Sequence, residues 1–290
     1  MAKLSRTVTA AMALVCLLLP SLPRAASNAQ QLRVTAASQP LLKPVLLTNS
    51  LTTQPTKWRR ITWLLPTRPA WSAHRLQWRQ SGQQAWQTSK ATARKNRQPL
   101  AAYQTITVKL TGLAAGQRYE YRLAGRQNGS PTRYSTVHSF STAPAQAADF
   151  HFLALADAQG STAGYRKYWG NTLAKALKTV PDAAFVVQLG DLVDQVNTNQ
   201  MTAWVKATGQ QMASPAFNPI LGNHDAGQAA GQMFSRLFPQ TSVNSLPLNY
   251  AVRYSNVLLL CLNTNNTSLA KLRVQAKWIK REAAAWHKRW

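Results

Sequence analysis

Three short segments in the second half of the chain carry side chains that could bind a metal ion or transfer a proton. Each comes directly after an apolar run, and they are Asp-Ala-Gln at 157–159, Gly-Asp-Leu-Val-Asp at 190–194 and Gly-Asn-His-Asp at 222–225. The whole chain has only eight Asp and Glu residues, and four of them lie in these segments. A single Asp after a strand is usually a turn or cap residue. Repetition of the pattern at three strand ends indicates a metal site with oxygen ligands instead.

The elements expected around these segments place them at one edge of a sheet. Alternating predicted strands and helices occupy residues 150–156, 172–179, 184–189, 199–212 and 217–221. Strands that alternate with helices form parallel βαβ units, and ligands bind beyond the carboxyl ends of their strands. The intervals agree with about 30 residues per unit, since 34 residues separate Asp157 from Asp191 and 32 separate Asp191 from Asn223.

Residues 30–145 are expected to form an all-β domain. Segments rich in β-branched and aromatic residues lie at 60–64, 75–79, 103–108 and 119–123, with turn signals between them. The stretch at 110–121 resembles the tyrosine-corner region of a fibronectin type III sandwich, in which a Tyr hydroxyl binds the loop backbone. This resemblance implies a two-sheet antiparallel sandwich that ends near Pro144.

The last part of the chain is predicted to hold a hairpin, a strand and a helix. Residues 248–257 have the pattern of a hairpin strand and its turn, and residues 257–263 that of a buried strand. Residues 268–290 have the pattern of a basic helix.

The N-terminus has the pattern of a signal peptide at residues 1–29. Lys3 and Arg6 precede a mostly apolar stretch at 8–19, which is shorter than the about 20 residues that span a bilayer. Small residues at 27–29 offer a cleavage site. An uncleaved membrane anchor is the alternative, and no later segment is predicted to cross a membrane.

Once the leader is removed, Cys261 is the only cysteine, so an intrachain disulfide is excluded. It lies in an apolar run at 257–262, where we expect a buried thiol that acts as a small hydrophobic residue.

The charge balance is extreme, with 34 Lys and Arg against 8 Asp and Glu and a net charge of +26. Such a field attracts polyanions, but the basic residues are scattered and form no known nucleic-acid module. Together with the signal peptide, the charge favours a secreted, extracellular protein that is retained on anionic cell-wall polymers. A role in solubility alone is the alternative.

The three polar segments together resemble the first three motif blocks of calcineurin-like metallophosphoesterases. With the β-sandwich before them, they look like a purple-acid-phosphatase-like protein. The resemblance implies an N-terminal fibronectin type III-like sandwich, followed at 149–290 by an α/β metallophosphatase domain in which two sheets pack together and are flanked by helices.

The resemblance also implies a pair of divalent or trivalent metal ions, whose identity among iron, zinc and manganese the residues do not fix. Asp157 would bind one metal, Asp191 would bridge both, and Asn223 would bind the second. Gln159 stands where many members of the family have a His. Its amide oxygen is a weaker ligand for zinc or iron than an imidazole.

The implied reaction is attack of a metal-bound hydroxide on phosphorus. His224 would protonate the leaving oxygen or stabilise the phosphoryl charge, and Asp225 would orient its imidazole. Asp194 stands where true purple acid phosphatases have an iron-binding Tyr. A tyrosinate–iron pair is therefore not expected, and Asp194 becomes a candidate for supporting the metal ligands.

The later histidine blocks of the family, Val-x-x-His and Gly-His-x-His, are not found, and His287 matches neither. The phosphatase domain is therefore predicted to be truncated, with little turnover and marginal solubility in this form. The expected function is secreted, metal-dependent hydrolysis of small phosphomonoesters. A phosphodiesterase and a non-catalytic basic envelope-binding protein with a degenerate phosphatase-like domain are the alternatives.

Overall fold

The computed structural model describes residues 41–287 apart from 52, 161, 227, 239–247 and 266–267. The predicted signal peptide, the first residues of the predicted β domain and the last three residues of the predicted C-terminal helix lie outside the described residues. The described residues belong to one compact unit, which spans residues 40–290.

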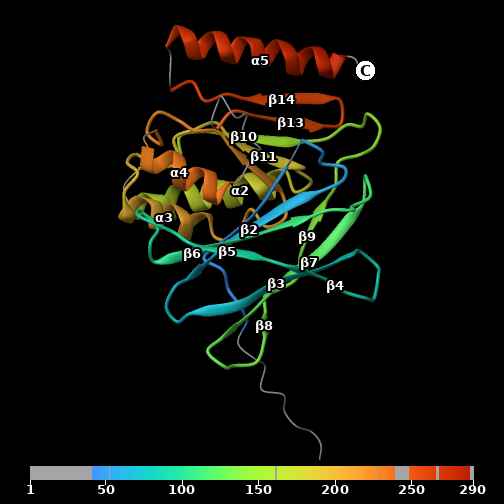
Figure 1. Ribbon diagram of the computed structural model, residues 1–290, viewed down its shortest axis with the longest axis vertical. Helices are drawn as coiled ribbons and strands as arrows, with labels where there is room; N and C mark the ends of the chain where they lie inside the picture. The colour runs from blue at the N-terminus through green and yellow to red at the C-terminus, as the bar shows by residue number, and fades with distance from the viewer. Residues whose placement is uncertain are drawn as a thin grey trace, which may run out of the picture. The chain divides into compact units, whose positions relative to one another are not determined.

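Two antiparallel sheets form the sandwich predicted for the first half of the chain (Figure 1). One sheet contains β2 (Arg59–Pro66), β5 (Thr92–Lys95) and β6 (Tyr103–Leu110), and the other contains β3 (Trp71–Gln80), β4 (Gln87–Lys90), β7 (Arg118–Gln127), β8 (Arg133–Tyr134) and β9 (His138–Ser141). The four segments predicted as strands lie within β2, β3, β6 and β7, so the predicted all-β architecture is confirmed.

The sandwich core follows from the alternation of side chains along each strand. Ile61 and Trp63 of β2, with Ile106 and Val108 of β6, point to the inner face and are buried. They pack in one apolar cluster with Tyr121 of the opposite sheet. The residues between them on β2 and β6 therefore point to the outer face of the sandwich.

The predicted tyrosine corner is present. The Tyr119 hydroxyl accepts a hydrogen bond from the backbone N–H of Ala114 at 2.8 Å. This contact joins the loop before β7 to that strand, as in fibronectin type III domains.

β1 (Leu46–Ser50), a strand that the sequence patterns did not reveal, joins the sandwich to the α/β part. It pairs antiparallel with β2 and parallel with β12 (Ala216–Pro219). β12 pairs parallel with β11 (Phe185–Gln188), and β11 pairs parallel with β10 (Phe152–Leu155). One seven-stranded sheet therefore runs in the order β10-β11-β12-β1-β2-β6-β5. The strands after residue 149 in this sheet, β10, β11 and β12, pair in parallel, whereas β2, β5 and β6 pair antiparallel.

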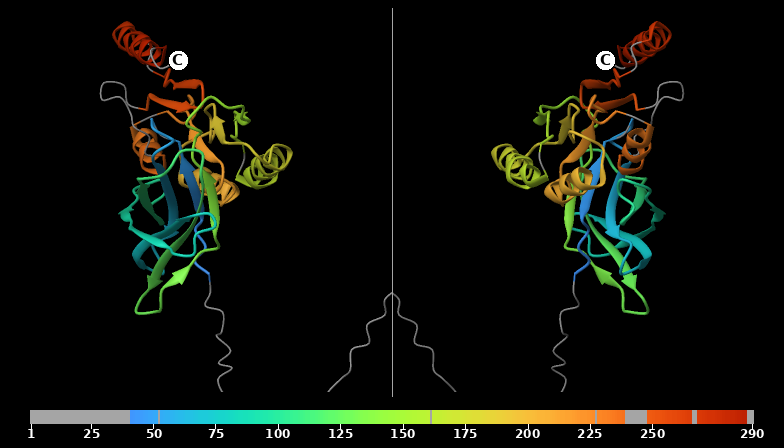
Figure 2. Two further views of the ribbon diagram at one scale, coloured as in Figure 1. Left: turned by 90° about the vertical axis from the view of Figure 1, so that its right-hand side faces the viewer. Right: turned by 90° about the vertical axis from the view of Figure 1, so that its left-hand side faces the viewer.

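Helices pack against one face of the parallel strands, and those between 162 and 208 lie together beside them (Figure 2). They are α1 (Thr162–Gly164), the π-helix η1 (Tyr165–Gly170), α2 (Asn171–Thr179), α3 (Thr198–Thr208) and α4 (Gln228–Leu237). Trp204 of α3 and Phe234 of α4 share an apolar cluster with Val186 and Phe217 of the strands. The two predicted helices are confirmed, although α3 ends early because Gly209 adopts a positive φ of 53°.

A hairpin covers the other face of the parallel strands. β13 (Tyr250–Tyr254) pairs only with β14 (Val257–Cys261) among the described residues, and Val252 packs with Phe185 and Val187. α5 (Leu269–His287) lies over this hairpin (Figure 1), with Trp278 against Ala251. Two packed sheets with flanking helices were predicted, and this layering confirms them.

Two strands are less buried than predicted. β14 was expected to be a buried strand, but four of its five residues are only half-buried, because it belongs to a two-stranded hairpin rather than to the main sheet. β10 is the edge strand of the seven-stranded sheet, and Phe152 is 43% exposed there. Within the described part of the chain, no helix is both long enough and apolar enough to cross a membrane.

Candidate functional site

The three polar segments lie at the carboxyl ends of β10, β11 and β12, which are neighbouring parallel strands. The backbone turns sharply after two of these strands, since Asp157 has a φ of 54° and Asp191 a φ of 53°. Residues with a Cβ rarely adopt this left-handed region. Backbone strain of this kind is concentrated at functional sites, and here both strained residues are the carboxylates predicted to bind metal.

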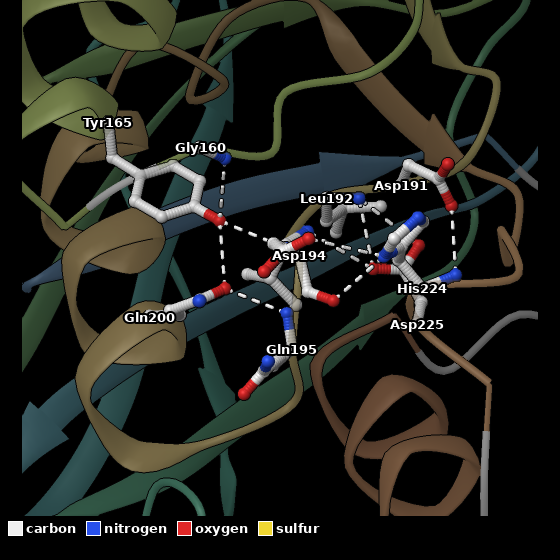
Figure 3. A network of polar contacts seen from close by, with 10 residues as sticks. Gly160, Tyr165, Asp191, Leu192, Asp194, Gln195, Gln200, His224 and Asp225 are labelled. Carbon is white, nitrogen blue, oxygen red and sulfur yellow. Dashed lines mark hydrogen bonds and ion pairs between the residues drawn. The ribbon is translucent and has the colours of Figure 1, made fainter.

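Contacts between the loops bring the three segments together. The backbone N–H of Asp157 donates to the carbonyl of Gly190 in a weak bond of 3.4 Å. The backbone N–H of His224 donates to Oδ1 of Asp191 at 3.1 Å (Figure 3). The loop after β11 therefore contacts both of the other loops, and Asp191 lies between them.

Two glycines permit this close approach. A Cβ on Gly222 would overlap the backbone nitrogen and Oδ1 of Asp191. A Cβ on Gly190 would lie 2.8 Å from the Cα of Gly222, and Gly190 also has a φ of 97°. The glycine of each motif is therefore required by packing between the two loops as well as by the turn.

Asp225 is buried and fastens the loop after β12 to the loop after β11. Its carboxylate accepts hydrogen bonds from the backbone N–H groups of Leu192 at 2.9 Å, Val193 at 3.2 Å and Gly222 at 3.1 Å. Burial raises the pKa of this carboxyl, and the three backbone donors oppose that shift. Asp225 therefore fixes the position of the two loops relative to each other.

The imidazole of His224 is held by Asp194. Its Nδ1 lies 2.9 Å from the carbonyl oxygen of Asp194 and 3.4 Å from that residue's carboxylate. Because a carbonyl can only accept, Nδ1 carries the proton and Nε2 is left for a substrate. The hydrogen bond to the Asp194 backbone raises the pKa of His224, desolvation partly opposes this shift, and the carboxylates of Asp191, Asp194 and Asp225 add to it. We predicted that Asp225 orients the imidazole of His224, but Asp194 makes that contact instead.

Tyr165 is a supporting residue that the sequence patterns did not reveal. Its hydroxyl accepts from the backbone N–H groups of Gly160 at 3.2 Å and Asp194 at 3.1 Å, and donates to Gln200 at 3.2 Å (Figure 3). Gln200 also accepts from the backbone N–H of Gln195 at 2.7 Å. The side chain thus joins the first loop to the second, and no local motif distinguishes it from a core Tyr.

Asn265, which follows β14, supports the loop after β12. Its amide nitrogen lies 3.3 Å from the carbonyl of Leu221 and 3.2 Å from that of Gly222. The segment after β14 therefore helps to fix the backbone that leads into Asn223.

The candidate metal ligands offer oxygen donors only. Asp157 and Asn223 are exposed and Asp191 is half-buried, while Oε1 of Gln159 is buried without a hydrogen-bond partner. A buried acceptor without a partner is unfavourable unless a ligand satisfies it. Two carboxylates and two amides suit one hard cation such as Mg²⁺, Ca²⁺ or Mn²⁺. Among the described residues no three His, Cys, Asp or Glu are grouped to hold a metal, so a dinuclear pair stays a prediction.

Comparison with known proteins agrees with this architecture. Residues 44–142 match the family model of the purple acid phosphatase N-terminal domain. No curated protein sequence matches the chain. Among solved structures, purple acid phosphatase PPD1 from yellow lupin (Lupinus luteus) seeds is similar with 15% identity and a TM-score of 0.64, over 82% of this chain and 48% of that one. PhoD is similar with 16% identity and a TM-score of 0.52, over 75% of this chain and 51% of that one.

The described part of the chain therefore shares its fold with these two solved structures. The chain carries a purple acid phosphatase N-terminal domain at 44–142, followed by an α/β part with the fold of the two solved structures. It spans about half the length of each of them.

Proposed function

We propose that this chain provides the metal-binding and phosphate-binding core of a phosphoesterase that hydrolyses phosphomonoesters. The observation that carries the proposal is the convergence of three loops at the ends of β10, β11 and β12, held by the contact of His224 with Asp191 and of Asp225 with Leu192. The donors present and the phosphatase-like fold both support this function.

Each side chain would contribute in a different way. Asp157, Gln159, Asp191 and Asn223 would hold the cation, which supplies Lewis acidity toward a phosphoryl oxygen. His224 holds a proton on Nδ1 against Asp194 and presents Nε2 to the substrate, where it can stabilise charge or deliver a proton to the leaving oxygen. Asp225 and Tyr165 keep the loops in place.

We expect turnover by this chain to be low. The four proposed ligands include no imidazole, and oxygen donors with only two carboxylates bind zinc and iron weakly. A weakly held cation would reduce both substrate binding and the polarisation of the phosphoryl group. Low solubility, predicted from the sequence, stays a prediction.

Metal binding and hydrolysis test the proposal together. Mn²⁺ binding should be measurable by calorimetry and should be lost in Asp191→Ala, but not in the control Asp149→Ala, which removes an exposed carboxylate outside the three loops. Slow hydrolysis of p-nitrophenyl phosphate should follow the same pattern. Equal behaviour of the two variants would contradict the site. Fast turnover that Asp191→Ala abolishes would contradict the weak-metal argument, and preference for bis-p-nitrophenyl phosphate would favour a phosphodiesterase.

The alternative is a non-catalytic protein that binds anionic envelope polymers. The net charge of +26 favours it, as do the cation–π contacts of Trp86 with Arg79 at 4.3 Å and with Arg122 at 4.7 Å. Binding to an anionic cell-wall polymer should weaken as salt rises, because exposed charges are screened over about 8–10 Å. Polymer binding that Asp191→Ala leaves intact, without metal-dependent turnover, would select this alternative.

We also propose that the protein acts outside the cytoplasm, because residues 1–29 have the pattern of an export signal. The N-terminal sequence of protein recovered from an expressing culture tests this. A mature chain that starts near residue 30 in the extracellular fraction is expected, and an intact N-terminus in the cytoplasm would contradict it.

A further inference from the structure

A cavity of about 840 Å³ lies between α4 and the sandwich sheet that contains β2, β5 and β6, on the outer face of that sheet. In Figures 1 and 2, α4 lies beside the strands of this sheet. The described residues that line the cavity come from β2, β5 and β6, from α4, from the loops after β12 and β14, and from Leu248 just before β13. Its volume is within the range of small-molecule sites, which is about 300–1,000 Å³.

The sheet wall of the cavity presents polar side chains in a regular array. Thr105, Thr107 and Lys109 are alternate residues of β6 and therefore share its outer face, while the residues between them point into the sandwich core. Their cross-strand partners are Arg94, opposite Thr105, and Arg60, opposite Lys109. Hydroxyl groups and cations from three adjacent strands therefore face the same space, although the Thr105 hydroxyl donates its proton to Oδ1 of Asn96 at 2.8 Å.

Positive charge is concentrated in this wall. Arg60 and Lys109 are directly opposite each other on antiparallel strands, an arrangement in which like charges destabilise the sheet. Both lie over the ring of Trp58, with Lys109 at 4.4 Å and Arg60 at 5.8 Å, and these cation–π contacts partly offset the repulsion. An anion in the cavity would remove that repulsion.

α4 contributes a fourth cation, Arg236, whose Nη1 lies 3.4 Å from the carbonyl of Lys95 at the end of β5. Four of the 15 described lining residues are Arg or Lys, against 34 of 290 in the whole chain. None of the described lining residues is Asp or Glu. The described lining of the cavity is therefore more basic than an already basic chain.

The cavity adjoins the candidate metal site. Leu221 and Ala226 line it, and they are the residues immediately before and after the segment 222–225. Asn265, another lining residue, binds the carbonyls of Leu221 and Gly222. A ligand in this space would therefore reach the loop that carries His224.

We propose that the cavity binds the non-reacting phosphate groups of a small ligand that carries more than one phosphate, while the reacting phosphate lies at the loops. The part of this proposal that concerns reaction rests on the proposed function, but the binding does not. Guanidinium and ammonium groups with neighbouring hydroxyls are the donors that recognise phosphate oxygens. The substrate class is accordingly a polyphosphorylated small molecule rather than a simple monophosphate.

Binding of inorganic tripolyphosphate tests the cavity without any contribution from turnover. The full chain is titrated by calorimetry in the presence of EDTA, and the double variant Arg94→Gln/Lys109→Gln is compared with Lys90→Gln/Arg126→Gln. All four positions are exposed, and the control pair removes the same charge from the other sandwich sheet, on β4 and β7. We expect the cavity pair to weaken binding by about ten-fold or more, because two charge-assisted hydrogen bonds are lost, and the control pair by less than about two-fold.

Three outcomes overturn the proposal. Equal weakening by both pairs shows a diffuse electrostatic effect, and an unchanged affinity in the cavity pair shows that the cavity is not used. Orthophosphate that binds as tightly as tripolyphosphate removes the preference for several phosphates. Circular dichroism verifies folding, and the single variants Arg94→Gln and Lys109→Gln serve if the double variant unfolds. Tripolyphosphate binding that depends on the cavity, in a chain without metal-dependent turnover, would contradict the proposed function and leave the cavity assignment standing.

Discussion

The Asp225 carboxylate lies 2.9 Å from the backbone nitrogen of Leu192, 33 positions earlier in the chain. The contact fixes the distance between the loop after β11 and the loop after β12. It therefore positions the two segments that carry Asp191, Asn223 and His224. The acid at the end of the Gly-Asn-His-Asp motif supports the site through the backbone rather than through the imidazole.

Asp225→Asn should destabilise the fold and loosen the site. An amide has one acceptor oxygen, and its NH₂ group would face backbone donors that the carboxylate now satisfies. Leaving buried donors unsatisfied is expected to lower the free energy of unfolding by about 2–4 kcal/mol. Urea denaturation measures the loss. The exposed Asp149→Asn is the control, and a loss no larger than that of the control would show that the contact does not hold the loops.

Gly222→Ala should damage the site through steric overlap. The new methyl group would collide with the backbone nitrogen and carboxylate of Asp191, so the two loops must separate. We expect a loss of more than about 2 kcal/mol in unfolding free energy and a loss of Mn²⁺ binding. Gly160→Ala is the matched control, because a Cβ there meets nothing within 4 Å and its φ is not positive. If both variants bind Mn²⁺ like the parent chain, the loops are not in contact.

Tyr165→Phe should separate the first loop from the second while leaving the apolar core intact. The ring of Tyr165 is buried and stays, but two backbone donors and one side-chain acceptor lose the hydroxyl. The expected loss is about 1–3 kcal/mol, together with weaker Mn²⁺ binding. Tyr168→Phe removes a hydroxyl from the neighbouring turn, where the side chain is 64% exposed, and should change neither quantity. Urea unfolding midpoints measure the stability of both variants, and calorimetry measures their Mn²⁺ binding. Equal results for the two variants would contradict the role of the Tyr165 hydroxyl.

The sequence was sufficient to predict where the three polar segments lie. Apolar runs that end in Asp157, Asp191 and the segment 222–225 imply parallel strands, and the ends of such strands must meet at one sheet edge. This inference needs only local patterns and one topological rule, and for that reason it is confirmed. The two glycines were also predictable as turn residues, but their contact with each other was not.

The partners of the site residues were beyond local patterns. Whether Asp225 faces an imidazole or a set of backbone donors depends on how closely two loops pack, which spacing along the chain does not encode. The sequence around Tyr165 does not distinguish it from a core Tyr, and its role shows only when the loops after β10 and β11 are seen together in the structure. β1 is five residues long, and nothing in its sequence shows that its Asn49 pairs with Ala216 of β12, 167 residues later.

Burial of Cys261 gives a pH-dependent stability that can be measured. Its thiol is 2% exposed, and burial raises its pKa from 9.0 to about 11. A group whose pKa is raised on folding contributes stability that is fully present below its unfolded pKa and is lost as the pH rises through the folded value. The window for this group therefore lies between about pH 9 and about pH 11.

The test compares Cys16→Ser with Cys16→Ser/Cys261→Ala by urea denaturation at pH 8 and pH 10, so that only one thiol differs. The difference in unfolding free energy between the two chains should shrink by about 1 kcal/mol between these pH values, because the unfolded thiol ionises first. Groups that do not contact Cys261 act equally on both chains and cancel; Tyr250, whose pKa is raised well above its ordinary value by burial and by Cys261, is the exception. The thiol should also react slowly with a disulfide reagent at pH 8 in the folded chain and rapidly in guanidinium. Rapid reaction without denaturant, or a difference that is constant with pH, would show that Cys261 is not buried as the structure places it.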